Sequence, residues 1–139
     1  MITKKQLVKL PDSELDIMLV LWNFDGECKV ADIYNGLKDS HPLSKPAIHT
    51  LLERLEKRGF IETKTVDAPT PYKTIFPVVT EEEYRTAESG NFVDKLFRGN
   101  WKNLITALVD NGKITKNDIE EISRMILEKE TENQTSRKG

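Results

Sequence analysis

Apolar side chains recur every three or four residues along most of this chain, and the spacing changes to two in one region only. A period near 3.6 predicts amphipathic helices, and a period of two predicts strands. Helices are therefore expected from Asp12 to before Asp25, over about 29–39 and over 45–58, strands over 60–66 and 72–78, and three more helices within 80–129. The expected fold class is mainly α with a small β-hairpin.

The segment from Ser44 to Gly59 has the start, the periodicity and the end of a helix. Ser44 can cap it, Pro46 suits a first turn, and Gly59 can adopt the left-handed conformation that ends a helix. The face expected to be buried consists of Ile48, Leu51, Leu52 and Leu55. The opposite face carries donors and cations, namely Pro46, His49, Thr50, Glu53, Arg54 and Lys57. Such a helix can enter the major groove of DNA, although the pattern also suits an ordinary surface helix.

Two helices before this segment give it a context. The buried stripe of the first is expected to consist of Leu15, Met18, Leu19 and Trp22, widened by Ile17 and Leu21. The second places its apolar residues, Val30, Ile33, Tyr34 and Leu37, on one side. A short connection containing Pro42 then leads into the central helix, because the residue before a proline resists the helical conformation. Two helices joined in this way predict a helix-turn-helix.

After Gly59, two segments rich in aromatic and β-branched residues flank the turn sequence at 67–71. This arrangement predicts an antiparallel hairpin. Three helices followed by a hairpin predict a winged helix, which we assign to a domain of residues 1–79.

The helices expected within 80–129 are short and amphipathic, and Thr80 and Thr115 suit two of their N-termini. They have too little volume to close a core of their own, so their apolar stripes need a partner, and a second copy of the segment is the simplest one. The expected dimerisation residues are Phe92, Leu96, Trp101, Leu104, Ile105, Leu108, Ile119, Ile122 and Ile126. The alternative is a monomer in which these helices fold back on the winged helix. Residues 130–139 are almost without apolar side chains and are expected to be a disordered tail.

Composition narrows the classes of function. The chain has 139 residues and a formal net charge of −2, so its overall charge gives no reason to expect nucleic acid. Residues 44–76 nevertheless hold six Lys or Arg against four Asp or Glu, a local +2 that predicts modest, salt-sensitive affinity. No apolar stretch is long enough to span a membrane, and no apolar signal region follows Met1. We therefore expect a cytoplasmic protein without a membrane partner.

Little in the sequence suggests catalysis or metal binding. The single Cys28 cannot form an internal disulfide, and His41 and His49 make no zinc-like cluster with it. The sequence has neither a glycine-rich phosphate loop nor a nucleophile elbow. We therefore expect no enzymatic activity, no cofactor and no metal site, and we expect Cys28 to be a buried or incidental thiol.

Residues in two segments resemble the penicillinase-repressor family of bacterial winged-helix regulators. In and just before the first helix they are Leu10, Glu14, Met18, Leu21 and Trp22, and in the central segment Ser44, Ile48, Thr50, Leu51, Leu52, Arg54, Leu55, Lys57 and Gly59. The similarity continues through the hairpin and the C-terminal helices, over residues 10–128. It implies a winged helix followed by a C-terminal three-helix dimerisation segment, in a dimeric repressor that reads a palindromic operator.

This chain also departs from the family. Lys45-Pro46-Ala47 and His49 stand where other residues are usual, so the operator sequence cannot be carried over. The hairpin tip lacks the Gly and Arg often found there, which leaves Lys64 and Lys73 as its phosphate-contacting candidates. The cysteine cluster of the copper-responsive branch is missing, and we reject copper sensing.

The leading hypothesis is a homodimeric repressor that binds a double-stranded DNA operator and is relieved by a signal acting on the dimer or its C-terminal helices. Base edges would be read by Lys45, Pro46, Ala47, His49, Thr50 and Glu53, and phosphates would be held by Ser44, Arg54, Lys57, Lys64 and Lys73. A winged-helix protein-interaction module that does not bind DNA is the alternative. The operator, the target genes and the inducing signal are not readable from the sequence.

A regulatory protease is a further candidate partner. In antibiotic-responsive members of the resembling family, cleavage falls at an Asn-Phe bond in the fifth helix. Alignment through Leu104 places Ala107-Leu108 there, whereas the one Asn-Phe pair of this chain, Asn91-Phe92, lies in the preceding helix. We therefore expect that such a protease does not cleave this chain, unless it recognises the helix rather than the dipeptide.

Overall fold

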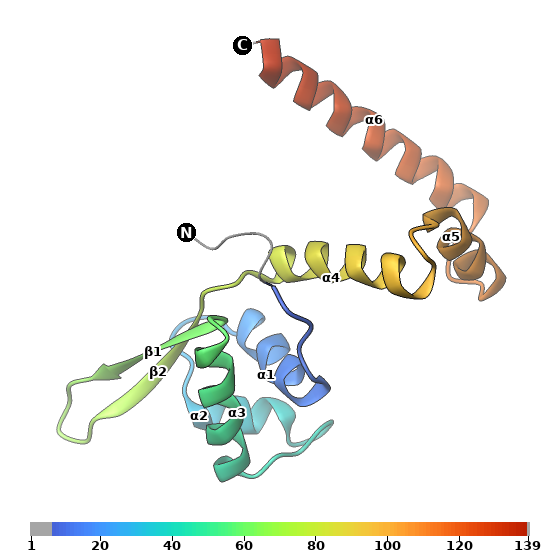
Figure 1. Ribbon diagram of the computed structural model, residues 1–139. Helices are drawn as coiled ribbons and strands as arrows, with labels where there is room; N and C mark the ends of the chain where they lie inside the picture. Colours follow the sequence, from blue (N-terminus) through green and yellow to red (C-terminus); the bar gives the residue numbers. More distant parts are fainter. Residues whose placement is uncertain (1–6, 139) are drawn as a thin grey trace. The chain divides into compact units, whose positions relative to one another are not determined.

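The computed structural model describes residues 7–138 of the chain, and for residues 134–138 only the backbone (Figure 1). The elements run in the order α1 (Asp12–Trp22), α2 (Val30–Leu37), α3 (Lys45–Lys57), β1 (Ile61–Val66), β2 (Tyr72–Pro77), α4 (Glu81–Leu96), α5 (Trp101–Asp110) and α6 (Lys116–Lys138). The predicted fold class, mainly α with one small hairpin, is confirmed. The described chain divides into two compact units at Ser89–Gly90, which we call unit 1 and unit 2.

The central helix α3 begins and ends where its sequence predicts. Ser44 is the N-cap, and its Oγ accepts a hydrogen bond from the Ala47 N–H at 3.2 Å. Gly59 follows the helix with a φ of +80°, a conformation that other residues rarely adopt. All four residues of the predicted stripe, Ile48, Leu51, Leu52 and Leu55, are buried.

The stripe of α1 is rotated relative to the sequence prediction. Ile17, Met18 and Leu21 are buried, whereas Leu19 is 41% exposed. Glu14 is only 1% exposed, because its Oε1 accepts a hydrogen bond from Arg58 Nε at 2.9 Å. This ion pair allows a carboxylate to occupy a core position that the hydrophobic pattern gave no reason to expect.

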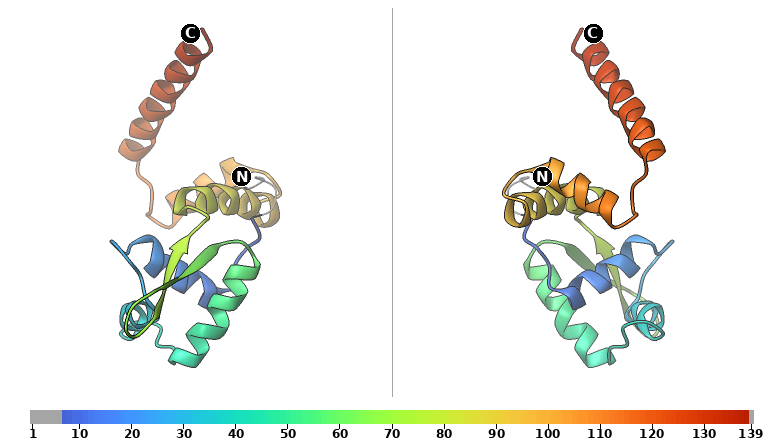
Figure 2. Two further views of the ribbon diagram at one scale, coloured as in Figure 1. Left: turned by 90° about the vertical axis from the view of Figure 1, so that its left-hand side faces the viewer. Right: turned by 90° about the vertical axis from the view of Figure 1, so that its right-hand side faces the viewer.

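The hairpin pairs β1 with β2 in antiparallel register, from Ile61 opposite Pro77 to Val66 opposite Tyr72. A bridge between Cys28 and Ile75 adds one residue from the segment before α2, and the Ile75 N–H donates to the Cys28 carbonyl at 2.9 Å. The strands extend past the three helices as a wing (Figures 1 and 2). Unit 1 is therefore a winged helix, as predicted.

The first part of α4 closes the core of unit 1. Tyr84 is buried, its Oη accepts from the Leu10 N–H at 2.9 Å, and its ring contacts those of Trp22 and Phe60. The Trp22 indole N–H donates to the Val79 carbonyl at 2.9 Å. Trp22 is therefore a partly buried core residue whose polar group is satisfied.

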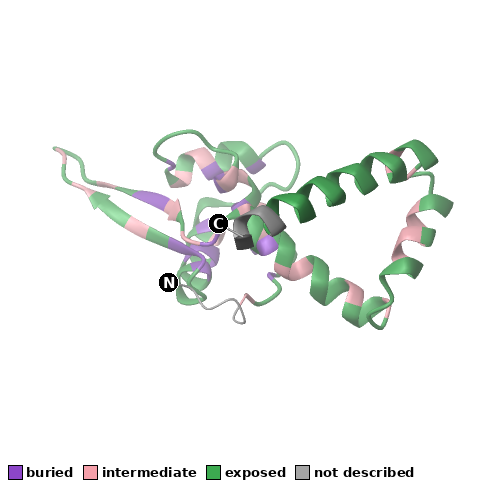
Figure 3. Ribbon diagram, turned by 90° about the horizontal axis from the view of Figure 1, so that it is seen from above, coloured by how far each residue is buried: buried purple, intermediate pink, exposed green. Residues whose placement is uncertain are grey.

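Unit 2 consists of the end of α4 with α5 and α6, and no residue among 90–133 is buried (Figure 3). Its helices have clear local signals. Asn100 caps α5 by accepting from the Asn103 N–H, and Gly112 follows α5 with a φ of +74°. Thr115 caps α6 as expected, and it exchanges hydrogen bonds with Asp118 in a capping box.

The end of the chain differs from the sequence prediction. Helix α6 continues through residues 130–138, which we expected to be disordered. These residues include Glu, Gln and Lys, which favour helices without contributing an apolar face. No helix in the described part of the chain is long and apolar enough to cross a membrane.

Candidate nucleic-acid interface

One face of α3 is open to solvent along its whole length. Its exposed residues are Ser44, Lys45, Pro46, His49, Thr50, Glu53, Arg54 and Lys57, and Ala47 is half-buried. The helix lies in front of α2 in Figure 1 and at the edge of unit 1 in both views of Figure 2. Every α3 residue that the sequence proposed for base or phosphate contact is therefore on the accessible surface.

Two hydroxyl groups on this face have defined roles in the helix. Ser44 Oγ accepts the cap hydrogen bond, so its own hydrogen is free to donate outward. Thr50 Oγ1 donates to the Pro46 carbonyl at 3.2 Å, so this hydroxyl offers lone pairs and a neighbouring methyl group. Ser44 thus suits a phosphate oxygen, and Thr50 suits a base donor or a thymine methyl.

A groove of about 480 Å³ lies beside α3, between the starts of α2 and α3 and the wing. Among its lining residues are three lysines, Lys29, Lys45 and Lys73, together with His49, and none of the lining residues is Asp or Glu. A groove with this lining attracts anions. The structure therefore brings Lys45 and His49 of the helix together with Lys73 of the wing.

Lys29 was missed in the sequence analysis. It immediately precedes α2, so its position at a helix start was the available signal. Its Nζ lies 4.1 Å from the centre of the Tyr72 ring, and Tyr72 Oη lies 3.4 Å from Glu27 Oε2, as a donor to that carboxylate. These contacts join the wing to the segment before α2 and fix one wall of the groove.

The two wing lysines lie on opposite faces of the hairpin. Lys73 pairs with Thr65 and Lys64 with Thr74, and side chains of successive residues alternate between faces. Lys73 and Thr65 both line the groove beside α3, whereas Lys64 Nζ lies 5.2 Å from the centre of the Phe76 ring. The two lysines that the sequence analysis proposed together as phosphate contacts therefore lie on different faces of the wing.

The charge of Arg58 does not add to the positive charge of this surface. Its guanidinium pairs with the buried Glu14 carboxylate, and the second oxygen of that carboxylate, Oε2, has no hydrogen-bond partner. Because this charge is balanced inside unit 1, the local excess of +2 counted over 44–76 overstates what α3 and the wing present. Lys29, which lies outside that range, adds one cation to the same surface.

Cys28 offers no chemistry to the site. It is buried, and burial, with a smaller contribution from Asp32, raises the pKa of its thiol to about 11. The thiol is therefore protonated at neutral pH, and a thiolate nucleophile or ligand is disfavoured. Across the described residues, no three His, Cys, Asp or Glu side chains are grouped so that they could hold a metal ion.

Known proteins are similar to this chain over both unit 1 and unit 2. A family model described as "Penicillinase repressor" matches residues 10–128. The chain is 26% identical over 121 residues to "Methicillin resistance regulatory protein MecI" of Mammaliicoccus sciuri, covering 87% of this chain and 95% of that protein. The protein of that name from Staphylococcus aureus strain N315 gives the same values. The "Penicillinase repressor" of Bacillus licheniformis is 22% identical over 124 residues, covering 89% of this chain and 94% of that protein.

Proposed function

The chain belongs to the penicillinase repressor family, and from this premise we propose that it is a homodimeric repressor whose two winged helices read a palindromic DNA operator. A family of transcriptional repressors is not an enzyme class. The observation that carries the proposal is the open face of α3 beside a groove that three lysines line. A DNA backbone in this groove would place the bases against α3.

The residues divide by chemistry. Lys45, Pro46, Ala47, His49, Thr50 and Glu53 face base edges, while Ser44, Arg54, Lys57, Lys64 and Lys73 hold phosphates. Glu53 is an exposed carboxylate on the surface proposed to meet DNA, where phosphates would repel it. Its favourable partner is therefore a hydrogen-bond donor on a base, such as the cytosine amino group. Lys29 joins the phosphate-binding residues because of its place in the groove.

Assembly supports the binding. A single winged helix with a small local charge excess binds weakly, and a dimer presents two copies of α3 to half-sites about one helical turn apart or a multiple of it. We assign the dimer contact to Phe92, Leu96, Trp101, Leu104, Ile105, Leu108, Ile119, Ile122 and Ile126. Of these, Leu104, Ile105 and Leu108 are half-buried and the others are exposed.

Binding to the protein's own promoter region and to a pool of genomic fragments, measured by fluorescence anisotropy over a series of salt concentrations, tests the proposal. Arg54→Ala and Lys57→Ala should weaken binding to all sequences and reduce the salt slope by about 1 each. His49→Ala should also change the preferred sequence. Lys9→Ala, an exposed lysine outside the groove, is the matched control and should change neither.

Protection of the selected DNA from nuclease should show an approximately two-fold symmetric footprint. Absence of salt-sensitive binding to every fragment would favour the protein-interaction module over the repressor.

Repression would be relieved by loss of the dimer, because DNA binding depends on it. Any signal that separates or cuts the helices of unit 2 removes the coupling between the two winged helices. The bond aligned with the family's cleavage site, Ala107-Leu108, lies inside α5, and the Asn91-Phe92 pair lies in α4. We propose that a β-lactam-type sensor protease does not cleave this chain and that another signal relieves it.

Co-expression with such a sensor protease, followed by addition of the antibiotic, tests this proposal. The chain should stay intact on a denaturing gel and by mass spectrometry. A fragment ending at Ala107 would show that the protease recognises the helix rather than the dipeptide.

A further inference from the structure

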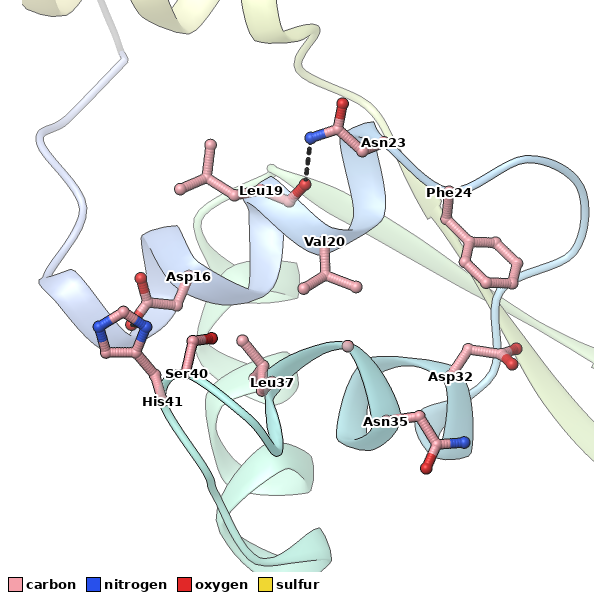
Figure 4. Close-up of a pocket in the computed structure, with 11 residues that line it drawn as sticks. Asp16, Leu19, Val20, Asn23, Phe24, Asp32, Asn35, Leu37, Ser40 and His41 are labelled. Carbon is pink, nitrogen blue, oxygen red and sulfur yellow. Dashed lines mark hydrogen bonds and ion pairs between the residues drawn. The ribbon is translucent and has the colours of Figure 1, made fainter.

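A second hollow of unit 1 lies between α1 and α2, on residues that the proposed operator contacts do not use (Figure 4). Its volume is about 650 Å³, and sites for small molecules commonly measure about 300–1,000 Å³. Ser40 and His41 line it as well, and these two residues belong to the turn that leads into α3.

Close helix packing forms the base of this hollow. A Cβ atom added at Gly36 would lie 2.8 Å from Val20 Cγ1, so α1 and α2 approach each other here as only a glycine permits. Around this contact, Leu19 is 41% exposed and Phe24 is 36% exposed. The hollow therefore offers an apolar surface that unit 1 leaves open.

The charge of the lining is one-sided. Asp16 and Asp32 line the hollow, and none of its lining residues is Lys or Arg. Asp16 Oδ2 lies 3.9 Å from His41 Nδ1, and Asp32 Oδ2 accepts a hydrogen bond from the Lys29 N–H at 2.9 Å. This lining is the reverse of the groove beside α3, which has three lysines and no carboxylate. These two hollows therefore suit ligands of opposite charge.

The separation of the two carboxylates indicates whether the hollow suits a metal ion or a small organic molecule. Asp16 lies beside His41 at one end of the hollow, and Asp32 lies near Phe24 at the other end (Figure 4). They do not converge on one point, as the ligands of a metal ion must. Apolar side chains between two separated carboxylates suit an organic cation better.

We propose that this hollow binds a small organic cation, with its apolar body against Leu19 and Phe24 and its protonated amine beside Asp16 or Asp32. The site is independent of the operator contacts, because none of its residues is among those proposed to meet DNA. Failure of DNA binding would therefore leave this site untouched, and the reverse also holds.

The test is a titration of the full chain, observed by NMR at the backbone amides. The probe is phenethylamine, with the neutral phenethyl alcohol and the anionic phenylacetate as comparators of similar shape. Phenethylamine should produce saturable shifts centred on α1 and α2, and the alcohol should bind roughly tenfold more weakly, since it lacks the charge-assisted hydrogen bond. Equal shifts from all three compounds, or none from phenethylamine, would overturn the proposal.

Asp16→Asn and Asp32→Asn remove one charge each while keeping the shape of the side chain. At least one of them should weaken phenethylamine binding roughly tenfold. Asp67→Asn, an identical change at an exposed position in the wing turn, is the matched control and should leave binding unchanged. If neither pocket variant weakens binding, or if the control weakens it equally, the site is not where we place it.

Discussion

Units 1 and 2 bury their apolar side chains to very different extents. All sixteen buried hydrophobic residues in the described part of the chain lie between Leu10 and Tyr84. Between residues 90 and 133 none is buried, and nine large apolar side chains are exposed there. A single chain therefore completes the fold of unit 1 and leaves unit 2 with uncovered apolar surface, which is the ordinary signature of an interaction site.

The difference concerns stability as well as packing. Burial of apolar surface is the main favourable contribution to folding, at roughly 25 cal/mol per Å², and unit 2 gains little of it within one chain. Its helices have caps but no core. A second copy supplies the same apolar stripes in a symmetric arrangement, which makes it the simplest partner. If the proposed dimer forms, substitutions in unit 1 should act within a single chain, whereas substitutions in unit 2 should act on the association of two chains.

The largest expected effect comes from a charge in the apolar stripe of α5. Leu104→Asp or Leu108→Asp would place a carboxylate in the proposed interface at a cost of several kcal/mol. The variant should sediment as a monomer at micromolar concentration. The dispersed NMR signals of unit 1 should remain, which would show that unit 1 is still folded. Its DNA affinity should also fall, because the two winged helices are no longer coupled.

Asn103→Asp is the control for this experiment, since it adds the same charge to an exposed position of α5. It should remain dimeric. The two tryptophans provide a second measurement, because Trp22 belongs to unit 1 and the 60%-exposed Trp101 to unit 2. In a Trp22→Phe background, Trp101 emission should shift to shorter wavelength as concentration rises. A monomeric wild type at micromolar concentration would contradict the assignment of the dimer to unit 2.

The next effect is confined to unit 1. Arg58→Met would leave the Glu14 carboxylate buried without its partner, and breaking a buried pair in this way costs about 3–5 kcal/mol. Urea unfolding followed by Trp22 fluorescence in a Trp101→Phe background should report this loss. The double variant Glu14→Gln with Arg58→Met should recover part of it, because it buries no charge.

The matched control is Arg85→Ala, which removes an exposed pair with Glu81 one helical turn away. Exposed pairs of this kind contribute about 0.3–0.5 kcal/mol. If Arg58→Met cost no more than Arg85→Ala, the buried pair would not be holding α1 against the end of α3.

Features set by neighbouring residues were predictable from sequence, and features set by distant residues were not. Ser44, Gly59 and Thr115 act within one helical turn, so their roles followed from residue type and position. Glu14 and Arg58 lie 44 residues apart, and no local pattern announces their pairing. The assignment of Leu19 to the α1 stripe was wrong for the same reason, since tertiary contacts leave Leu19 exposed and bury Glu14, which the sequence had not placed in the stripe.

The candidate site divides in the same way. The open face of α3 follows from helical periodicity alone. The groove does not, because Lys29, Lys45 and Lys73 meet only through the packing of three separate elements. The opposite orientations of Lys64 and Lys73 depend on the register of the hairpin, which the turn sequence left open.

The smallest expected effect concerns the N-terminal capping box, which occurs once in α4 and once in α6. Thr80 Oγ1 accepts from the Glu83 N–H at 3.1 Å at the start of α4, and Thr115 Oγ1 accepts from the Asp118 N–H at 3.2 Å at the start of α6. The residue after the first box is the buried Tyr84, whereas the residue after the second is Ile119, which is 41% exposed. The two caps are therefore alike in geometry but differ in what they support.

Alanine at either threonine removes one hydrogen bond at a helix start, typically worth about 1 kcal/mol. Thr80→Ala should lower the unfolding free energy of unit 1 by about that amount, at any protein concentration, because Tyr84 connects α4 to the core of the same chain. Thr115→Ala should leave the Trp22-reported transition of unit 1 unchanged and instead weaken the proposed dimer about fivefold in sedimentation, since that dimer would cover the exposed apolar residues of α6. If Thr115→Ala destabilised unit 1 as much as Thr80→Ala does, unit 2 would be packing within its own chain, and the monomeric alternative would replace the dimer.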